Sequence, residues 1–373
     1  MQALLDAQRQ AFATDMMPSR AVRDDRLARL LVLTESHGGE FAAAISADFG
    51  HRSRHETDMA ETYFVIAGIG HARRHLARWM RSRRVPTAPH FWPGRSRIVR
   101  QPVGVVGIVS PWNYPYMLSV APAIGAIAAG NRVMVKPSEL TPRFSGLFAE
   151  TVGRHFEADE LAVVTGDAEA GKAFVSLPFD HLLFTGSTAV GRLVALAAAE
   201  NLTPVTLELG GKSPALLDES CDLDRAATSL VVGKLLNAGQ SCIAPDYVLL
   251  PLGREADFTA AVEAAVARRY PRLAENPDYS SVVNDRHYLR LQELLDDARA
   301  QGGRIVTVNP AGESFPPERP GRLPRRAGLP RVQQGEAGLP AGVDQCHGRS
   351  AATLRPTFRA RAVLAQTLVV TTL

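Results

Sequence analysis

Two residue types at a fixed spacing could carry out covalent catalysis in this chain. Cys242 ends the small-residue stretch Asn237–Cys242, and Glu208 opens Glu208–Gly211, 34 positions before the cysteine. A thiolate attacks carbonyl carbons readily, and a carboxylate can activate the water that releases the resulting intermediate. The apolar turn after Glu208 predicts a partly desolvated carboxylate, which is a better base than a solvated one. The alternatives are a small core cysteine and an ordinary solvated glutamate.

A third candidate is the amide of Asn113, in the rigid turn Pro111–Pro115. An uncharged NH₂ group aimed at the oxygen of an attacked carbonyl would stabilise the oxyanion. The neighbouring Trp112 and Tyr114 would fix the direction of the amide. Most asparagines beside a proline only shape or cap a turn, and this alternative stays open.

A glycine-containing turn is expected between a strand and a helix. Gly186, Ser187 and Gly191 follow the predicted strand 181–184. Backbone N–H groups at a helix start, with glycine allowing close approach, suit a dinucleotide pyrophosphate. Many strand–helix turns look similar, so the turn alone is a weak signal.

A lysine and an acid lie at the end of an earlier predicted strand. Lys136 ends the predicted strand 132–136, and Glu139 follows three residues later. At the carboxyl end of a parallel strand, this pair could hydrogen-bond a ribose, whereas the alternative is a surface ion pair. A carboxylate would repel a 2′-phosphate, which favours NAD and leaves NADP possible.

The elements that must position these residues follow an α/β order. Residues 1–84 have helical periodicity, and 86–103 are rich in proline, glycine and aromatics, which predicts a hairpin, with a surface loop as the alternative. Strands and helices then alternate from Val103, which predicts a doubly wound parallel sheet. We expect a dinucleotide-binding domain over 1–207 and the start of a catalytic domain over 208–315.

Composition narrows the class of protein. The net charge is +4, but residues 316–373 contribute +6, so the remainder is nearly neutral and a nucleic-acid partner is not indicated. Three cysteines favour a reducing, cytoplasmic compartment, and no apolar run approaches a membrane span. Acidic neighbours disfavour Cys221 as the nucleophile. His71 and His75 lack a third ligand, so no metal is expected.

The Glu208–Pro214, Cys242 and Pro111–Pro115 motifs together resemble the aldehyde dehydrogenase superfamily from about residue 20 to about 315. Ala244–Tyr247, after the cysteine, is similar to the branch containing coniferyl-aldehyde dehydrogenases. The resemblance implies an NAD(P)-dependent enzyme whose cysteine forms a thiohemiacetal and then a thioester, which Glu208 hydrolyses.

The same resemblance implies further roles. Trp112, Lys136, Glu139, Gly186, Ser187 and Gly191 would bind the cofactor, the hairpin at 86–103 would help subunits associate, and intact members would be homodimers. The substrate would be an aldehyde, such as coniferyl or another aromatic or long-chain aldehyde.

The resemblance stops at Pro316. Residues 316–373 contain nine Arg, no Lys and many Pro, Gly and Ala. Prolines and glycines oppose regular strand pairing, so we expect no regular structure there. The composition predicts a shifted reading frame and a catalytic domain that is incomplete and inactive or nearly so; a disordered basic tail and a divergent ending are alternatives. Two other functions therefore stay open: a catalytically dead dinucleotide-binding fragment and a cofactor-independent cysteine thioesterase or hydrolase.

Overall fold

A computed structural model describes residues 1–274, 276–313, 330–334 and 361–363, the last two segments as backbone only. The chain divides into two compact units. One comprises Met1–Asp48 and Arg54–Gly210, and the other comprises Phe49–Ser53 and Gly211–Leu373. Each unit is described by itself below.

Helices make up the first part of the first unit, as the periodicity of residues 1–84 predicts. Their bounds are α1 Gln2–Thr14, α2 Arg20–Phe49, α3 Arg54–Thr57, the π-helix η1 Asp58–Tyr63 and α4 Phe64–Trp79. Buried residues of α4 fall at helical spacing (Val65, Ile69, Ala72 and Leu76), so one face packs inward while the arginines occupy the rest.

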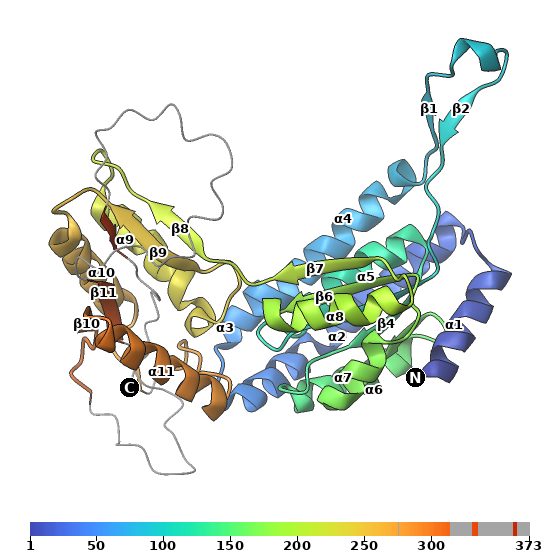
Figure 1. The fold of residues 1–373 in the computed structure, drawn as a ribbon. Coiled ribbons are helices and arrows are strands. Elements are labelled where there is room, and N and C mark those ends of the chain that lie inside the picture. The colour runs from blue at the N-terminus through green and yellow to red at the C-terminus, as the bar shows by residue number, and fades with distance from the viewer. Residues whose placement is uncertain (275, 314–329, 335–360, 364–373) are drawn as a thin grey trace. The chain divides into compact units, whose positions relative to one another are not determined.

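An antiparallel ribbon follows α4. Strand β1 (Arg83–Val85) pairs with β2 (Ser96–Ile98), and the short 3₁₀ helix η2 (Pro89–Phe91) lies at the tip. Figure 1 shows the ribbon extending away from the helices and sheet of its own unit. Its first strand begins before residue 86, because Arg83 and Arg84 already pair with Ile98 and Arg97.

A five-stranded parallel sheet forms the centre of this unit, with strand order β5-β4-β3-β6-β7. The strands are β3 Val105–Val109, β4 Arg132–Lys136, β5 Leu161–Val163, β6 His181–Gly186 and β7 Val205–Leu209. The connecting helices are α5 Met117–Ala129, α6 Pro142–His155, α7 Ala168–Val175 and α8 Thr188–Glu200. The chain winds outward from β3 to β5 and then restarts beside β3 at β6, so the predicted doubly wound topology is confirmed.

The central strands are buried on both faces, since four of the five residues of β3 and all five of β4 are buried. On one face, Leu5 of α1, Phe174 of α7 and Val194 of α8 pack in a cluster with strand residues that include Val105 and Leu182. Elsewhere in the unit, Phe41 of α2 and Tyr116 lie in a cluster of aromatic rings with Phe144 and Phe148 of α6. Strands covered in this way read as continuous apolar runs rather than alternating ones.

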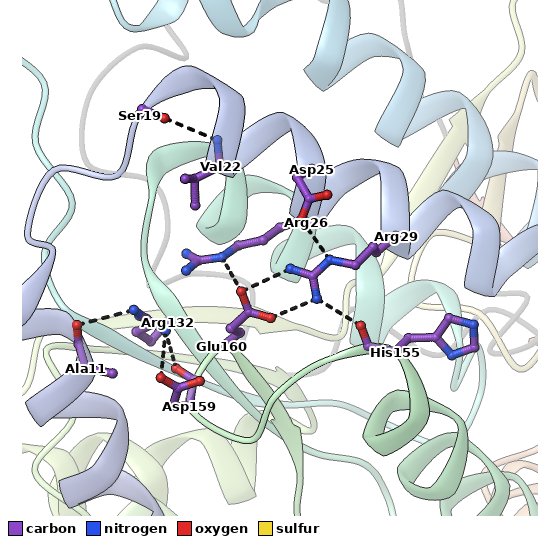
Figure 2. Close-up of polar contacts among 10 residues, drawn as sticks. All are labelled: Ala11, Ser19, Val22, Asp25, Arg26, Arg29, Arg132, His155, Asp159 and Glu160. Atoms are coloured by element: carbon purple, nitrogen blue, oxygen red, sulfur yellow. Dashed lines mark hydrogen bonds and ion pairs between the residues drawn. The ribbon is translucent and has the colours of Figure 1, made fainter.

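An ion-pair network joins α2 to the sheet (Figure 2). Glu160, just before β5, accepts hydrogen bonds from Arg26 Nε at 2.9 Å and from Arg29 Nη1 at 2.8 Å. Beside it, Arg132 of β4 pairs with Asp159 at 3.3 Å. Burial raises the pKa of Glu160, but hydrogen bonds from Arg29 and Arg26 outweigh burial and hold the pKa below its ordinary value.

The second unit contains two small sheets and three α-helices longer than a dozen residues among its described residues. Its elements are β8 Ser213–Leu216, α9 Leu223–Leu235, η3 Leu236–Gly239, β9 Pro245–Leu250, α10 Glu255–Arg269, α11 Asp285–Ala300, β10 Gly303–Thr307, β11 Pro330–Gln334 and β12 Arg361–Val363. Strands β8 and β9 run parallel, and α9, α10 and β9 share one apolar core.

Two segments of the tail differ from the expected lack of regular structure. Strand β11 pairs antiparallel with β10, and β12 pairs antiparallel with β9. Backbone groups on the exposed edges of β10 and β9 account for this, since an open edge accepts a further strand whatever its side chains. Pro330 is the first residue of β11, where a missing N–H is tolerated. The rest of 314–373, including Cys346, lies outside the described residues.

Candidate functional site

The predicted cofactor residues and Glu208 all belong to the first unit and lie at one edge of its sheet. Trp112 and Asn113 follow β3, Lys136 ends β4, Gly186 ends β6, and Glu208 is the penultimate residue of β7. All five strands are parallel, so their carboxyl ends share an edge. The strand order reverses between β3 and β6, and the crevice at such a switch point is where open α/β sheets bind ligands.

The Asn113 turn is held by short polar contacts. The hydroxyl groups of Ser110 and Ser119 are 2.6 Å apart and buried, which ties the end of β3 to the first turn of α5. The Asn113 Oδ1 atom accepts the backbone N–H of Tyr114 at 3.1 Å. The oxygen thus faces the backbone of the turn, and the NH₂ group is the part of this side chain that can donate. This orientation suits both a turn-shaping residue and an oxyanion donor.

Lys136 is a buried cation at the end of β4. Its side chain is 3 % exposed, and Nζ donates to the Pro137 carbonyl oxygen at 2.9 Å and lies 3.8 Å from a carboxylate oxygen of Glu139. Burial lowers the pKa of Lys136, while Glu139 and Asp167 oppose that shift. The ammonium group has three N–H donors, so those not used by the Pro137 carbonyl oxygen could bond a ligand hydroxyl group. Glu139 itself is exposed at the surface.

Residues of the glycine-containing turn have two different structural roles: Ser187 caps a helix, and Gly191 allows close packing. Ser187 is the N-cap of α8, and its side chain accepts the Val190 N–H at 3.3 Å. Gly191 is buried, and a Cβ there would lie 2.7 Å from a methyl carbon of Leu209. Gly191 therefore lets α8 approach β7 closely, whereas Gly186 and Ser187 lie where a phosphate could meet the helix start.

The environment of Glu208 differs from the one that the sequence predicts. The residue is exposed, so the desolvation that the apolar turn predicts is absent. The reason is its place in the sheet: β7 is the edge strand of β5-β4-β3-β6-β7, and only β6 flanks it. The register places Glu208 opposite Thr185, next to the glycine-containing turn.

Cys242 lies in the second unit, on the loop between η3 and β9, and it is exposed. The loop is formed by an unusual backbone. Asn237 and Ala238 both have φ of 52°, and Gly239 has φ of 76°. A left-handed conformation is costly for residues with a Cβ and persists only where the surroundings enforce it, which is common at active sites.

Hydrogen bonds from Gln240 help to hold this backbone conformation, a role that the sequence did not indicate. Its Nε2 atom donates to the carbonyl oxygens of Asn237 and Ser281, each at 2.9 Å, and its Oε1 atom accepts the Val283 N–H at 2.9 Å. The amide thus fixes the cysteine loop to a segment about forty residues away in the chain. The only available signal was a polar residue among small ones, because its partners are backbone groups that leave no trace in sequence.

Charged groups surround the cysteine loop. Lys234 of α9 is 4 % exposed, and its aliphatic stem packs beside Gly239. Burial lowers the pKa of Lys234 to about 8, opposed by the attraction of Asp246. Asp246 forms an ion pair with Lys212 at 3.0 Å. Gly211, which also belongs to the second unit, lies beside this loop, since a Cβ there would be 3.5 Å from the Cys242 carbonyl oxygen.

Two further observations concern the described part of the chain. No group of three or more His, Cys, Asp or Glu side chains there is placed to hold a metal ion. Within the same ranges, none of the helices has the length and apolar character needed to cross a bilayer.

Comparison with known proteins assigns the family. The aldehyde dehydrogenase family matches residues 1–320, and the chain belongs to this family. It is 46 % identical over 312 residues to coniferyl aldehyde dehydrogenase of Pseudomonas sp. strain HR199, covering 83 % of this chain and 64 % of that protein.

Solved structures agree with this assignment. A substrate-bound AldH of Staphylococcus aureus aligns with a TM-score of 0.77 and 35 % identity, covering 82 % of this chain and 66 % of that one. The P. syringae indole-3-acetaldehyde dehydrogenase AldA, in complex with NAD⁺ and IAA, aligns at 0.73 with 25 % identity, covering 82 % and 62 %. The chain thus spans about two thirds of the length of such relatives.

Proposed function

We propose that this chain binds NAD(P) at the carboxyl edge of the β3–β7 sheet and that Cys242 is an aldehyde-oxidising nucleophile. The observation that carries the proposal is the convergence of the β3, β4 and β6 turns at the switch point, with the buried ammonium group of Lys136 among them. The fit to a dinucleotide is chemical: a cation and a carboxylate for ribose hydroxyls, and a helix start for phosphate.

The residues of the chain would divide the reaction between them. The Cys242 thiolate attacks the aldehyde carbon and forms a thiohemiacetal, whose oxyanion accepts hydrogen bonds from the Asn113 NH₂ group and the Cys242 backbone N–H. A bound nicotinamide supplies the hydride acceptor that an aldehyde, lacking a leaving group, requires. Glu208 removes a proton from the water that hydrolyses the Cys242 thioester to the carboxylic acid.

The exposure of Glu208 bears on the second half of this cycle. A solvated carboxylate is a weak base, so we infer that substrate or cofactor must cover Glu208 before it activates water. Its position on edge strand β7 leaves one side available for such a cover.

We further infer NAD as the cofactor, because the Glu139 carboxylate lies 3.8 Å from the Lys136 ammonium group and would repel a 2′-phosphate there. The substrate class is an aromatic or long-chain aldehyde, coniferyl aldehyde being the activity named for the relative at 46 % identity. Free thiols at Cys221 and Cys242 are compatible with a reducing compartment, for which we propose the cytoplasm.

The β1–β2 ribbon is the element we propose for subunit association in a homodimer. Phe91 and Trp92 at its tip are 66 % and 71 % exposed, and both rings lie on a projecting two-stranded ribbon that cannot bury them itself.

Binding and turnover assays separate this proposal from its alternatives. NADH binding with aldehyde-dependent NADH formation supports the dehydrogenase, and binding without turnover indicates a dinucleotide-binding fragment. Thioester hydrolysis that needs no nucleotide indicates a cysteine hydrolase.

Variants then test the roles of single residues. Cys242→Ser should abolish NADH formation while leaving NADH binding intact, because a hydroxyl group is a poor nucleophile near neutral pH. Glu208→Gln should give a burst of NADH and then stall, and Asn113→Ala should slow the burst by roughly a hundredfold. Substantial oxidation by Cys242→Ser would remove that residue from its proposed role.

A further inference from the structure

The two helices that follow the Asn113 and Lys136 turns share an unusual start. Neither α5 nor α6 is capped by the side chain of its own N-cap residue, Tyr116 and Thr141 respectively, and neither has an acid in its first turn. The first backbone N–H groups of a helix need acceptors when they are buried. In both helices a carboxylate from the N-terminal helical segment supplies them.

Glu61 caps α5. Its side chain is completely buried, and Oε2 accepts the backbone N–H of Tyr116 at 2.7 Å and of Met117 at 3.2 Å. Glu61 lies in the π-helix η1, and such a widened turn re-aims side chains relative to an α-helix. A negative charge against a helix start also gains from the helix dipole.

The capped turn of α5 is directly bonded to the Asn113 turn. The Leu118 N–H donates to the Tyr114 carbonyl oxygen at 2.9 Å, and the Ser119 hydroxyl donates to the Pro115 carbonyl oxygen at 2.6 Å. Asn113 is thus held between β3 on one side and a helix start fixed by Glu61 on the other.

Asp48 caps α6 in the same way. Its two carboxylate oxygens accept the N–H groups of Arg143 at 3.1 Å and Phe144 at 2.9 Å, the second and third residues of the helix. An N-cap side chain normally bonds these two positions. Asp48 is only partly exposed, and burial raises the pKa of its carboxyl group, opposed by these two hydrogen bonds.

The capped turn of α6 is bonded to the Lys136–Glu139 turn. The Ser145 hydroxyl donates to the Ser138 carbonyl oxygen at 3.0 Å, and the Leu140 N–H donates to the Ser138 hydroxyl at 3.2 Å. Ser138 lies between Lys136 and Glu139 in the chain, so the start of α6 sets the backbone between the two ribose-binding candidates.

We propose that Glu61 and Asp48 are positioning residues, each of which holds one of the two site turns through the helix that follows it. Each carboxylate accepts two hydrogen bonds from backbone N–H groups, and hydrogen bonds to a charged acceptor are stronger than neutral ones. Glu61 acts on the Asn113 turn and Asp48 acts on the Lys136–Glu139 turn. Their consequence for ligand binding rests on the function proposed above, whereas the local fixing of each turn does not.

The test compares Glu61→Gln and Asp48→Asn, which keep the side-chain shape and remove the charge, by hydrogen–deuterium exchange read by mass spectrometry. Glu61→Gln should speed exchange about tenfold in peptides covering 112–120 and leave 138–147 unchanged, and Asp48→Asn should do the reverse. Glu150→Gln, an exposed acid on α6, is the matched control and should change neither peptide. Acceleration of both peptides in either variant, or of neither, overturns the proposal.

ADP-ribose, which lacks the nicotinamide, is the ligand probe. Asp48→Asn should weaken ADP-ribose binding about tenfold, because misplacing the Lys136–Glu139 turn removes contacts to the ribose, while Glu61→Gln, which acts through the Asn113 turn, should weaken it only about twofold. Equal weakening by both variants overturns the division of roles. If the unmodified protein binds no ADP-ribose, the proposed function fails, and the crossed exchange pattern still decides whether the two carboxylates hold the turns.

Discussion

Replacing Lys136 by Met should move stability and cofactor affinity in opposite directions. In the structure the Lys136 ammonium group is buried, with one carbonyl oxygen at 2.9 Å and one carboxylate oxygen at 3.8 Å, and burial lowers the pKa of Lys136. A buried charge with so little compensation costs folding free energy, and a hydrophobic side chain of similar length removes that cost.

The magnitude follows from these contacts. Replacing poorly compensated buried charges typically stabilises by about 1 kcal/mol or more, which for a unit of this size raises Tm by roughly 2–4 °C. Loss of a charged donor to a ribose hydroxyl group costs about 1.5–3 kcal/mol of binding, so NADH affinity should fall roughly ten- to hundredfold.

Thermal unfolding and NADH fluorescence titration on the same preparation measure both effects. The matched control is Lys172→Met, since Lys172 is exposed and forms a surface ion pair with Glu169, and it should change neither quantity. A Lys136→Met variant that binds NADH as tightly as the parent would refute the ribose-binding role. A variant that unfolds at a lower temperature would refute the argument from uncompensated burial.

Two further substitutions test the electrostatics of each unit. Glu160→Gln should destabilise the first unit by about 3 kcal/mol at pH 7, because Arg26 and Arg29 lose their shared carboxylate. The pKa of Glu160 is lowered in the folded state, so the contribution is fully present above the ordinary pKa of a glutamate and is lost as pH falls through the lowered folded-state value; the stability difference between the two proteins should therefore be largest near neutral pH and shrink steadily on acidification. Lys234→Met should stabilise the second unit by up to about 3 kcal/mol at pH 7, since burial lowers the pKa of Lys234 from 10.5 to about 8. Because the unfolded chain binds the extra proton between these two values, the advantage should shrink as pH rises from 8 towards 10.5, and a constant difference across that range would contradict the assignment.

Much of the first unit could be predicted from the sequence. The apolar runs at Val105–Val109 and Arg132–Lys136 are strands with those bounds, and the helix before Gly130 ends where this glycine adopts φ of 95°. These features are local, because strand length, helix spacing and the left-handed preference of glycine each depend on a few consecutive residues. The parallel order then follows from the alternation of strands and helices.

The residues that hold the site are less visible in the sequence. Glu61 bonds N–H groups 55 and 56 positions away, and Gln240 bonds the backbone of Ser281 and Val283. Backbone partners carry no side-chain signature, so no spacing rule reveals them. The exposure of Glu208 was mispredicted for a related reason: its apolar neighbours suggested burial, but its place on an edge strand decides its environment.

The structure of the tail also differs from what its composition predicts. Its proline- and arginine-rich composition predicted no regular pairing, yet the backbone segments Pro330–Gln334 and Arg361–Val363 add to open strand edges. Sequencing the encoding DNA around codon 316 tests the predicted shift of reading frame: an insertion or deletion there is the expected result, and an unbroken family-like frame would contradict it.

Hydrogen–deuterium exchange of this chain with and without NADH tests the central claim most directly. Dinucleotide binding at the carboxyl edge predicts saturable protection in three peptides, those covering residues 110–116, 135–140 and 184–192, with little change in the β1–β2 ribbon. Absence of saturable NADH binding, or protection confined to other segments, would contradict the assignment of the cofactor site to this edge.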